Sequence, residues 1–217
     1  MSEILSETET IRITHSSNGK RLRSPIVVAV PRAKRPAQKA LNNYIIDAFS
    51  KKMPSLIPYA FNNKTVLERA KYLLRHKTGS HATLYQDVYG MYRFCESIDT
   101  TPDQLVKQCK NSEGYQDQQE TQRLIRQVDD FIGDLQAEGL AKSTINNYVK
   151  GIKALFRSNG LTLDLPFKMS KRVQYKDRSP TPEELQQVIE IADIREKVIV
   201  SILALSGIRI GTLVKLQ

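Results

Sequence analysis

GLAKSTINNYVKGIKALFRSNG, residues 139–160, combines two patterns on one helix. Apolar residues at three- and four-residue steps predict one buried face: Ile145, Tyr148, Val149, Ile152, Leu155 and Phe156. A second set, at steps of four, four, three and four, predicts a cationic stripe beside that face: Lys142, Asn146, Lys150, Lys153 and Arg157. We expect Ser143 to cap this helix and Gly160 to end it. Such a helix can sit on a core and face a nucleic-acid groove, and the alternative is a solvated lysine face.

Working outward, the same periodicity predicts an all-α fold. Helix starts are expected at Ala40, after Asn63, at about His81, at Thr101-Pro102, at about Gln118, at Ser143, at Thr181 and at about Arg195. Residues 1–39 lack sustained periodicity and are expected to form a flexible basic arm. Within it, Ile26 to Val30 fit one short strand, but Pro25 and Pro31 bracket them and no pairing partner is evident. Both a DNA-contacting arm and an ordinary flexible terminus remain open.

Composition sets the class of partner. The chain has 217 residues, 40% of them apolar, and 33 Lys and Arg against 23 Asp and Glu give a net charge of +10. This balance favours a polyanion, either nucleic acid or an anionic membrane surface. No apolar run approaches the roughly 20 residues of a spanning helix, and the N-terminus lacks the order of a signal peptide. Cys95 and Cys109 show no metal-ligand or disulfide spacing, and Cys95 fits a core position. We therefore expect an intracellular, cytoplasmic, DNA-associated protein with no metal site.

The segment after Gly160 predicts an interdomain linker, because periodicity disappears and cations gather there: Lys168, Lys171, Arg172, Lys176 and Arg178. Regular structure restarts at Thr181-Pro182-Glu183-Glu184, where Thr181 fits an N-cap, Pro182 the first turn and Glu184 a capping box. The helix from about residue 195 to 205 is apolar nearly all round and must be buried on several sides. The roughly 40 residues after the linker are too few to bury it.

Arg209 follows that apolar helix and the turn at Ser206-Gly207. An arginine held between packed elements can bind two oxygens of one phosphate, at rest or in reaction. The alternative is an arginine that pairs with a carboxylate or covers the helix end.

Four motifs in order resemble the tyrosine recombinases, or phage-type integrases. Ser80-His81-Ala82-Thr83, followed by Tyr89, Tyr92 and Phe94, and then residues 139–146 with Leu155-Phe156 are similar to the core-binding domain of that family. Residues 178–185 and Leu205-Ser206-Gly207-Ile208-Arg209-Ile210-Gly211-Thr212-Leu213 are similar to the start of its catalytic domain. The likeness covers about residues 64–217. It departs from the family at Gly211-Thr212, where Ser-Glu is usual, which puts one local hydrogen bond in doubt.

The resemblance implies a reaction in which a tyrosine attacks a DNA phosphodiester, forms a 3′-phosphotyrosyl link and needs no metal or nucleotide cofactor. Arg209 matches the first of two arginines that stabilise the pentavalent phosphorus. The nine tyrosines and three histidines of this sequence all precede Arg209, so none matches the family's nucleophile or activating histidine by position. We expect the chain to be inactive by itself, and whether it is an enzyme stays open.

The expected architecture is a helical core-binding bundle of the SAM-like type, a linker and the first helices of a truncated catalytic domain. The boundaries are an arm at 1–39, a helix and connector at 40–63, the DNA-binding domain at 64–160, the linker at 161–178 and the catalytic start at 179–217. Expected contacts to double-stranded DNA are the stripe, the linker cations and three residues near the N-terminus of the 143–160 helix: Ser143, Thr144 and Asn147. In the family, other recombinase protomers are further partners.

Two alternatives predict different behaviour. An inactive regulator would occupy recombination sites and form no covalent phosphotyrosyl product. A helical protein-interaction module, whose basic face is incidental, would show no steep salt dependence of DNA affinity.

Overall fold

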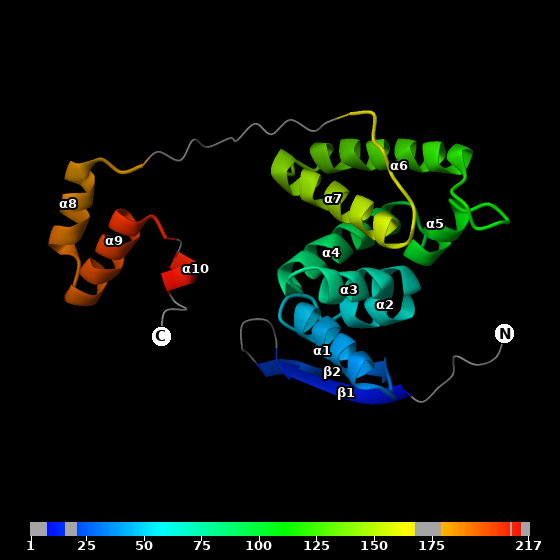
Figure 1. The fold of residues 1–217 in the computed structure, drawn as a ribbon, viewed down its shortest axis with the longest axis horizontal. Helices are drawn as coiled ribbons and strands as arrows, with labels where there is room; N and C mark the ends of the chain where they lie inside the picture. The colour runs from blue at the N-terminus through cyan, green and yellow to red at the C-terminus, as the bar shows by residue number, and fades with distance from the viewer. Residues whose placement is uncertain (1–7, 16–20, 168–178, 209, 214–217) are drawn as a thin grey trace. The chain divides into compact units, whose positions relative to one another are not determined.

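The computed structural model describes residues 8–15, 21–167, 179–208 and 210–213. The chain divides into two units, Met1–Lys171 and Arg172–Gln217. Most described residues are helical, as expected, and the exception is one two-stranded sheet (Figure 1). Within the described ranges, no helix combines the length and the apolar character needed to cross a bilayer.

The first unit begins with a β-hairpin. β1 (Thr8–His15) pairs antiparallel with β2 (Arg21–Pro31), so the short strand does have a partner and residues 8–15 and 21–31 are not simply an arm. Val28 and Val30 are buried in the same core as the helices, and β2 contacts α2. A two-stranded sheet leaves one edge of each strand unpaired, which is where proline is tolerated in a strand. The partner went unrecognised because strand pairing depends on residues distant in sequence.

Three helices follow the hairpin: α1 (Pro36–Ser50), α2 (Leu56–Asn62) and α3 (Lys64–His76). α1 starts four residues before the expected Ala40. α2 was not predicted, because Pro54 and Pro58 follow α1 closely in the sequence. Pro58 is its third residue, in the first turn, where a missing N–H costs no intrahelical hydrogen bond.

The rest of the unit is α4 (His81–Ser97), α5 (Pro102–Gln108), α6 (Gln118–Ala137) and α7 (Lys142–Ser158). Caps fix these starts: Ser80 accepts a hydrogen bond from the Thr83 N–H, and Thr101 forms a capping box with Gln104. The helix packing buries a continuous core that includes Cys95.

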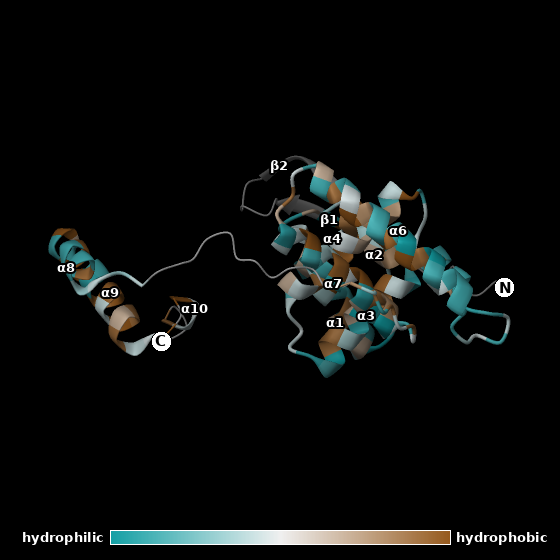
Figure 2. Ribbon diagram, turned by 90° about the horizontal axis from the view of Figure 1, so that it is seen from above, coloured by the Kyte–Doolittle hydropathy of each residue, from teal (hydrophilic) through white to brown (hydrophobic). Residues whose placement is uncertain are grey.

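The second unit contains α8 (Pro182–Ile191), α9 (Ile194–Ser206) and α10 (Ile210–Leu213). The capping box between Thr181 and Glu184 is present, and Gly207, with a φ of 63°, ends α9 in the left-handed conformation. No residue of these helices is buried. Ile191 and Leu205 are 88% and 89% exposed, and apolar residues run along both α8 and α9 (Figure 2). This agrees with the prediction that the segment cannot bury its own apolar helix.

Candidate nucleic-acid interface

α7 carries the cationic stripe and the polar residues that precede it. The helix begins at Lys142, with Ala141 as N-cap and no side-chain cap. The prediction that Ser143 caps it is therefore wrong, because Ser143 already lies in the first turn. Ser143 is exposed, so its hydroxyl is free to act at the helix surface.

The stripe lies on α7 beside its buried face. Lys142, Lys150 and Arg157 are exposed, and Asn146 and Lys153 are half-buried. None of the four cations forms an ion pair with a described carboxylate. Their charge is therefore available to an external anion rather than neutralised by a carboxylate that the structure describes.

Thr144 and Asn147 are half-buried. By helical spacing, Asn147 lies between the stripe and the α4 contact, and Thr144 lies in the row of Tyr148 and Gly151 that faces α4. α7 thus presents two adjoining surfaces. One is cationic and suits phosphate groups, and the other holds hydroxyl and amide groups that can bind phosphate or base edges.

α7 is held by an unusually close approach to α4. A Cβ placed on Gly151 would lie 2.7 Å from the Cα of Asp87, and one on Gly90 would lie 2.8 Å from the Cα of Tyr148. Glycine is therefore required on both helices where their backbones meet. This contact fixes the height and rotation of α7, and with them the direction of its polar face.

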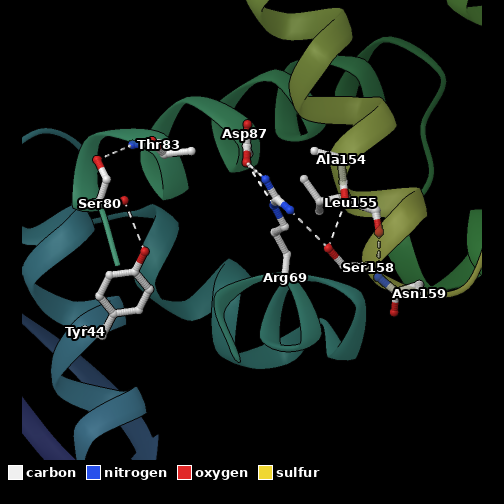
Figure 3. Close-up of polar contacts among 9 residues, drawn as sticks. All are labelled: Tyr44, Arg69, Ser80, Thr83, Asp87, Ala154, Leu155, Ser158 and Asn159. Atoms are coloured by element: carbon white, nitrogen blue, oxygen red, sulfur yellow. Dashed lines mark hydrogen bonds and ion pairs between the residues drawn. The ribbon is translucent and has the colours of Figure 1, made fainter. Parts of the chain in front are cut away.

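A buried ion pair adds a second restraint (Figure 3). Arg69 on α3 donates to the Asp87 carboxylate on α4 from Nε at 2.9 Å and Nη2 at 2.7 Å, and from Nη1 to Ser158 Oγ on α7 at 3.3 Å. Burial raises the pKa of the Asp87 carboxyl, and the Arg69 hydrogen bonds and charge offset part of that rise. Asn159 also donates to the Thr65 carbonyl at 3.1 Å. These contacts join α3, α4 and α7 near the C-terminal end of α7.

A tyrosine cluster on α4 and α7 adjoins this contact and was not anticipated from the sequence. Tyr85 and Tyr89 stack with ring centroids 5.7 Å apart, and Tyr148 meets Tyr89 edge-on at 5.6 Å. Lys52, in the turn after α1, has its Nζ 4.7 Å from the Tyr85 ring centre. Tyr148 was expected in the core, and it is instead half-buried at the core's edge. The i, i+4 spacing of Tyr85 and Tyr89 was the signal for their stacking.

Arg93 fixes the loop that leads into α7. Its Nη2 donates to both carboxylate oxygens of Glu138, at 3.1 and 2.8 Å. Gly139, with a φ of 81°, then turns the chain at the end of α6. The first residues of α7 are consequently anchored to α4.

Other predicted site residues lie outside the described residues. These are Arg209, which matches the catalytic arginine, and the linker cations Lys168, Lys171, Arg172, Lys176 and Arg178. Among the residues that the structure does describe, no group of three or more His, Cys, Asp or Glu side chains forms a metal site. The described part of the site is therefore a binding surface on α7.

Comparisons with protein-family models, with curated proteins and with solved structures found no match to this chain.

Proposed function

We propose that this chain is the DNA-binding N-terminal portion of a tyrosine-type site-specific recombinase, acting in DNA integration and recombination. The observation that carries the proposal is the set of four cations on one face of α7, none paired with a described carboxylate. An internal role for these cations would place carboxylates beside them. A duplex supplies a regular row of phosphates that such a stripe can contact.

The local structure of the motifs supports the proposal. Ser80, in the first motif, caps α4, and Thr181, in the third, caps α8. Gly207, in the fourth, ends α9 two residues before Arg209. We assign Arg209 the role of a phosphate ligand at the reacting phosphodiester, where a lost donor costs roughly 3–4 kcal/mol of transition-state stabilisation.

A protein-interaction module is the second candidate, and the apolar face of α8 and α9 favours it. Ile191, Ile194 and Leu205 are each more than four-fifths exposed. Exposed apolar patches mark interaction surfaces. This candidate predicts that DNA affinity is weak and does not depend on the stripe.

Fluorescence anisotropy with a labelled 30-base-pair duplex separates the two. The stripe variant is K150Q/K153Q/R157Q, since glutamine removes charge and retains helix propensity. The charge-matched control is K39Q/K107Q/R123Q, which removes three exposed cations scattered over α1, α5 and α6.

We expect the slope of log affinity against log salt to fall by about 0.9 for each phosphate that the stripe variant no longer neutralises. The control should bind nearly as the unmodified chain does. Equal weakening in both variants would mean that only net charge matters, and it would count against a defined interface on α7.

A further inference from the structure

A basic hollow of about 590 Å³ opens where the last turn of α3 approaches the first turn of α4. Its polar lining is Arg69, Arg75, His76, Lys77, Thr78 and Thr83. No carboxylate is among the described residues that line it. The hollow therefore combines concentrated positive charge with two hydroxyl donors.

Only part of the positive charge lining this basic hollow is paired with a described carboxylate. Arg69 is already committed to Asp87, and both side chains are only 11% exposed. Glu68, the acidic residue of α3, pairs with Lys71 at 2.7 Å. Arg75 and Lys77 form no ion pair with a described carboxylate.

Cations in the last turn of a helix also interact favourably with its dipole. That effect accounts for basic residues at the end of α3, where Arg75 and His76 lie. It does not account for a hollow that also gathers Thr78 and Thr83 around those cations. Arginine, lysine and threonine side chains all commonly donate hydrogen bonds to phosphate oxygens.

Tyr72 orders the side chains at the rim. The Arg69 guanidinium carbon lies 5.5 Å and the Lys77 Nζ 6.0 Å from the Tyr72 ring centre, and the His76 ring centre lies 5.6 Å from it. These contacts restrict the cations to the neighbourhood of the ring. A partly ordered cation loses less conformational freedom when it binds an anion.

The basic hollow lies at the C-terminal end of the α7 stripe. Asp87 of α4 faces Gly151 of α7, while Gly90 faces Tyr148, so the two helices run in opposite directions. The start of α4 therefore lies toward the end of α7, and Arg69, which lines the hollow, donates to Ser158, the last residue of α7 (Figure 3).

We propose that the basic hollow binds phosphate groups of the DNA backbone and extends the surface formed by the α7 stripe. This rests on the proposed function, because the same duplex occupies both. It gives α3, which precedes the first recognised motif, a direct role in binding. The duplex that fills the whole surface is longer than one that meets the stripe alone.

The test compares R75Q/K77Q with its charge-matched control K39Q/K107Q and with the stripe variant, in the full chain. Arg75 and Lys77 are exposed, so circular dichroism should show an unchanged fold. Anisotropy is measured against duplexes of 15 and 30 base pairs over a salt series, and calorimetry measures binding of inorganic pyrophosphate. We expect R75Q/K77Q to lower the salt slope by about 0.9 for each phosphate left without its cation, on the longer duplex more than on the shorter.

Unchanged DNA affinity in R75Q/K77Q, with a weakened stripe variant, would overturn the inference and leave the proposed function standing. Loss of pyrophosphate binding alone, with unchanged DNA affinity, would also overturn it, since the hollow would then serve a free phosphate compound. Absence of salt-dependent DNA binding by the unmodified chain would overturn both proposals together.

Discussion

Gly151→Ala tests the contact that positions α7. The added Cβ would meet the Asp87 Cα at 2.7 Å and its carbonyl oxygen at 2.9 Å, whereas ordinary contacts begin at 3.4 Å. The obstacle is backbone, which cannot rotate away, so α4 and α7 must part by about 0.7 Å. Overpacking of this kind costs about 1–3 kcal/mol. The backbone obstacle places this site at the upper end of that range.

Helix propensity acts in the other direction. Alanine is favoured over glycine in a helix by about 1 kcal/mol, so we expect a net loss of about 2 kcal/mol in the free energy of unfolding. Gly133→Ala is the matched control, because Gly133 is exposed on α6 and its added Cβ would meet nothing within 4 Å. It should stabilise the chain by up to about 1 kcal/mol.

Urea unfolding followed by circular dichroism measures both changes in one assay. Adding Gly90→Ala to Gly151→Ala should cost less than Gly90→Ala alone, because both sites lie across the same pair of helices. The reasoning is refuted if Gly151→Ala is as stable as the unmodified chain, or if Gly133→Ala loses as much stability as Gly151→Ala.

Three further outcomes follow from described contacts. Burial raises the pKa of Cys95 to about 12 and that of Cys109 to about 11, so both thiols stay protonated at pH 8. We expect a thiol reagent to label neither cysteine until urea is added, and rapid labelling of the folded chain would contradict this. Asp103 accepts hydrogen bonds from the first two N–H groups of α3, at 2.8 and 2.7 Å. Asp103→Ala should therefore lower the free energy of unfolding in urea by about 1–2 kcal/mol, and Asp103→Asn should lower it less. Equal losses in the two variants would contradict a capping role. Ile191→Ser with Leu205→Ser should reduce fluorescence of the hydrophobic dye ANS bound to the full chain, since both side chains are almost fully exposed; undiminished fluorescence would place the dye elsewhere.

Local patterns predicted most of the helical structure. The period of apolar residues located α4 and α6 within a residue, and the Thr181 capping box is present as expected. These features depend on neighbours within four positions, which a sequence displays directly. The many apolar residues around α9 likewise predicted that the second unit could not bury this helix with its own residues.

Features made by distant residues were missed. The hairpin requires β1 to pair with β2, and the register of that pairing is set by the fold rather than by either strand alone. The basic hollow requires the end of α3 to meet the start of α4. Gly90 and Gly151 are a further example of such a feature. From sequence, a glycine within a helix indicates only lower helix propensity, and its role in close packing is visible only once the neighbouring helix is known. The stripe was predictable because a single helix carries it.

Lysine footprinting tests the central claim most directly, since it identifies which side chains DNA covers. The full chain is acetylated with and without the 30-base-pair duplex, and the rate at each lysine is read by mass spectrometry. We predict that Lys142, Lys150 and Lys153 react more slowly when DNA is bound, while Lys39 and Lys107 react at the same rate. Equal rates at the three α7 lysines with and without bound DNA would contradict the assignment of α7 as the DNA-binding face.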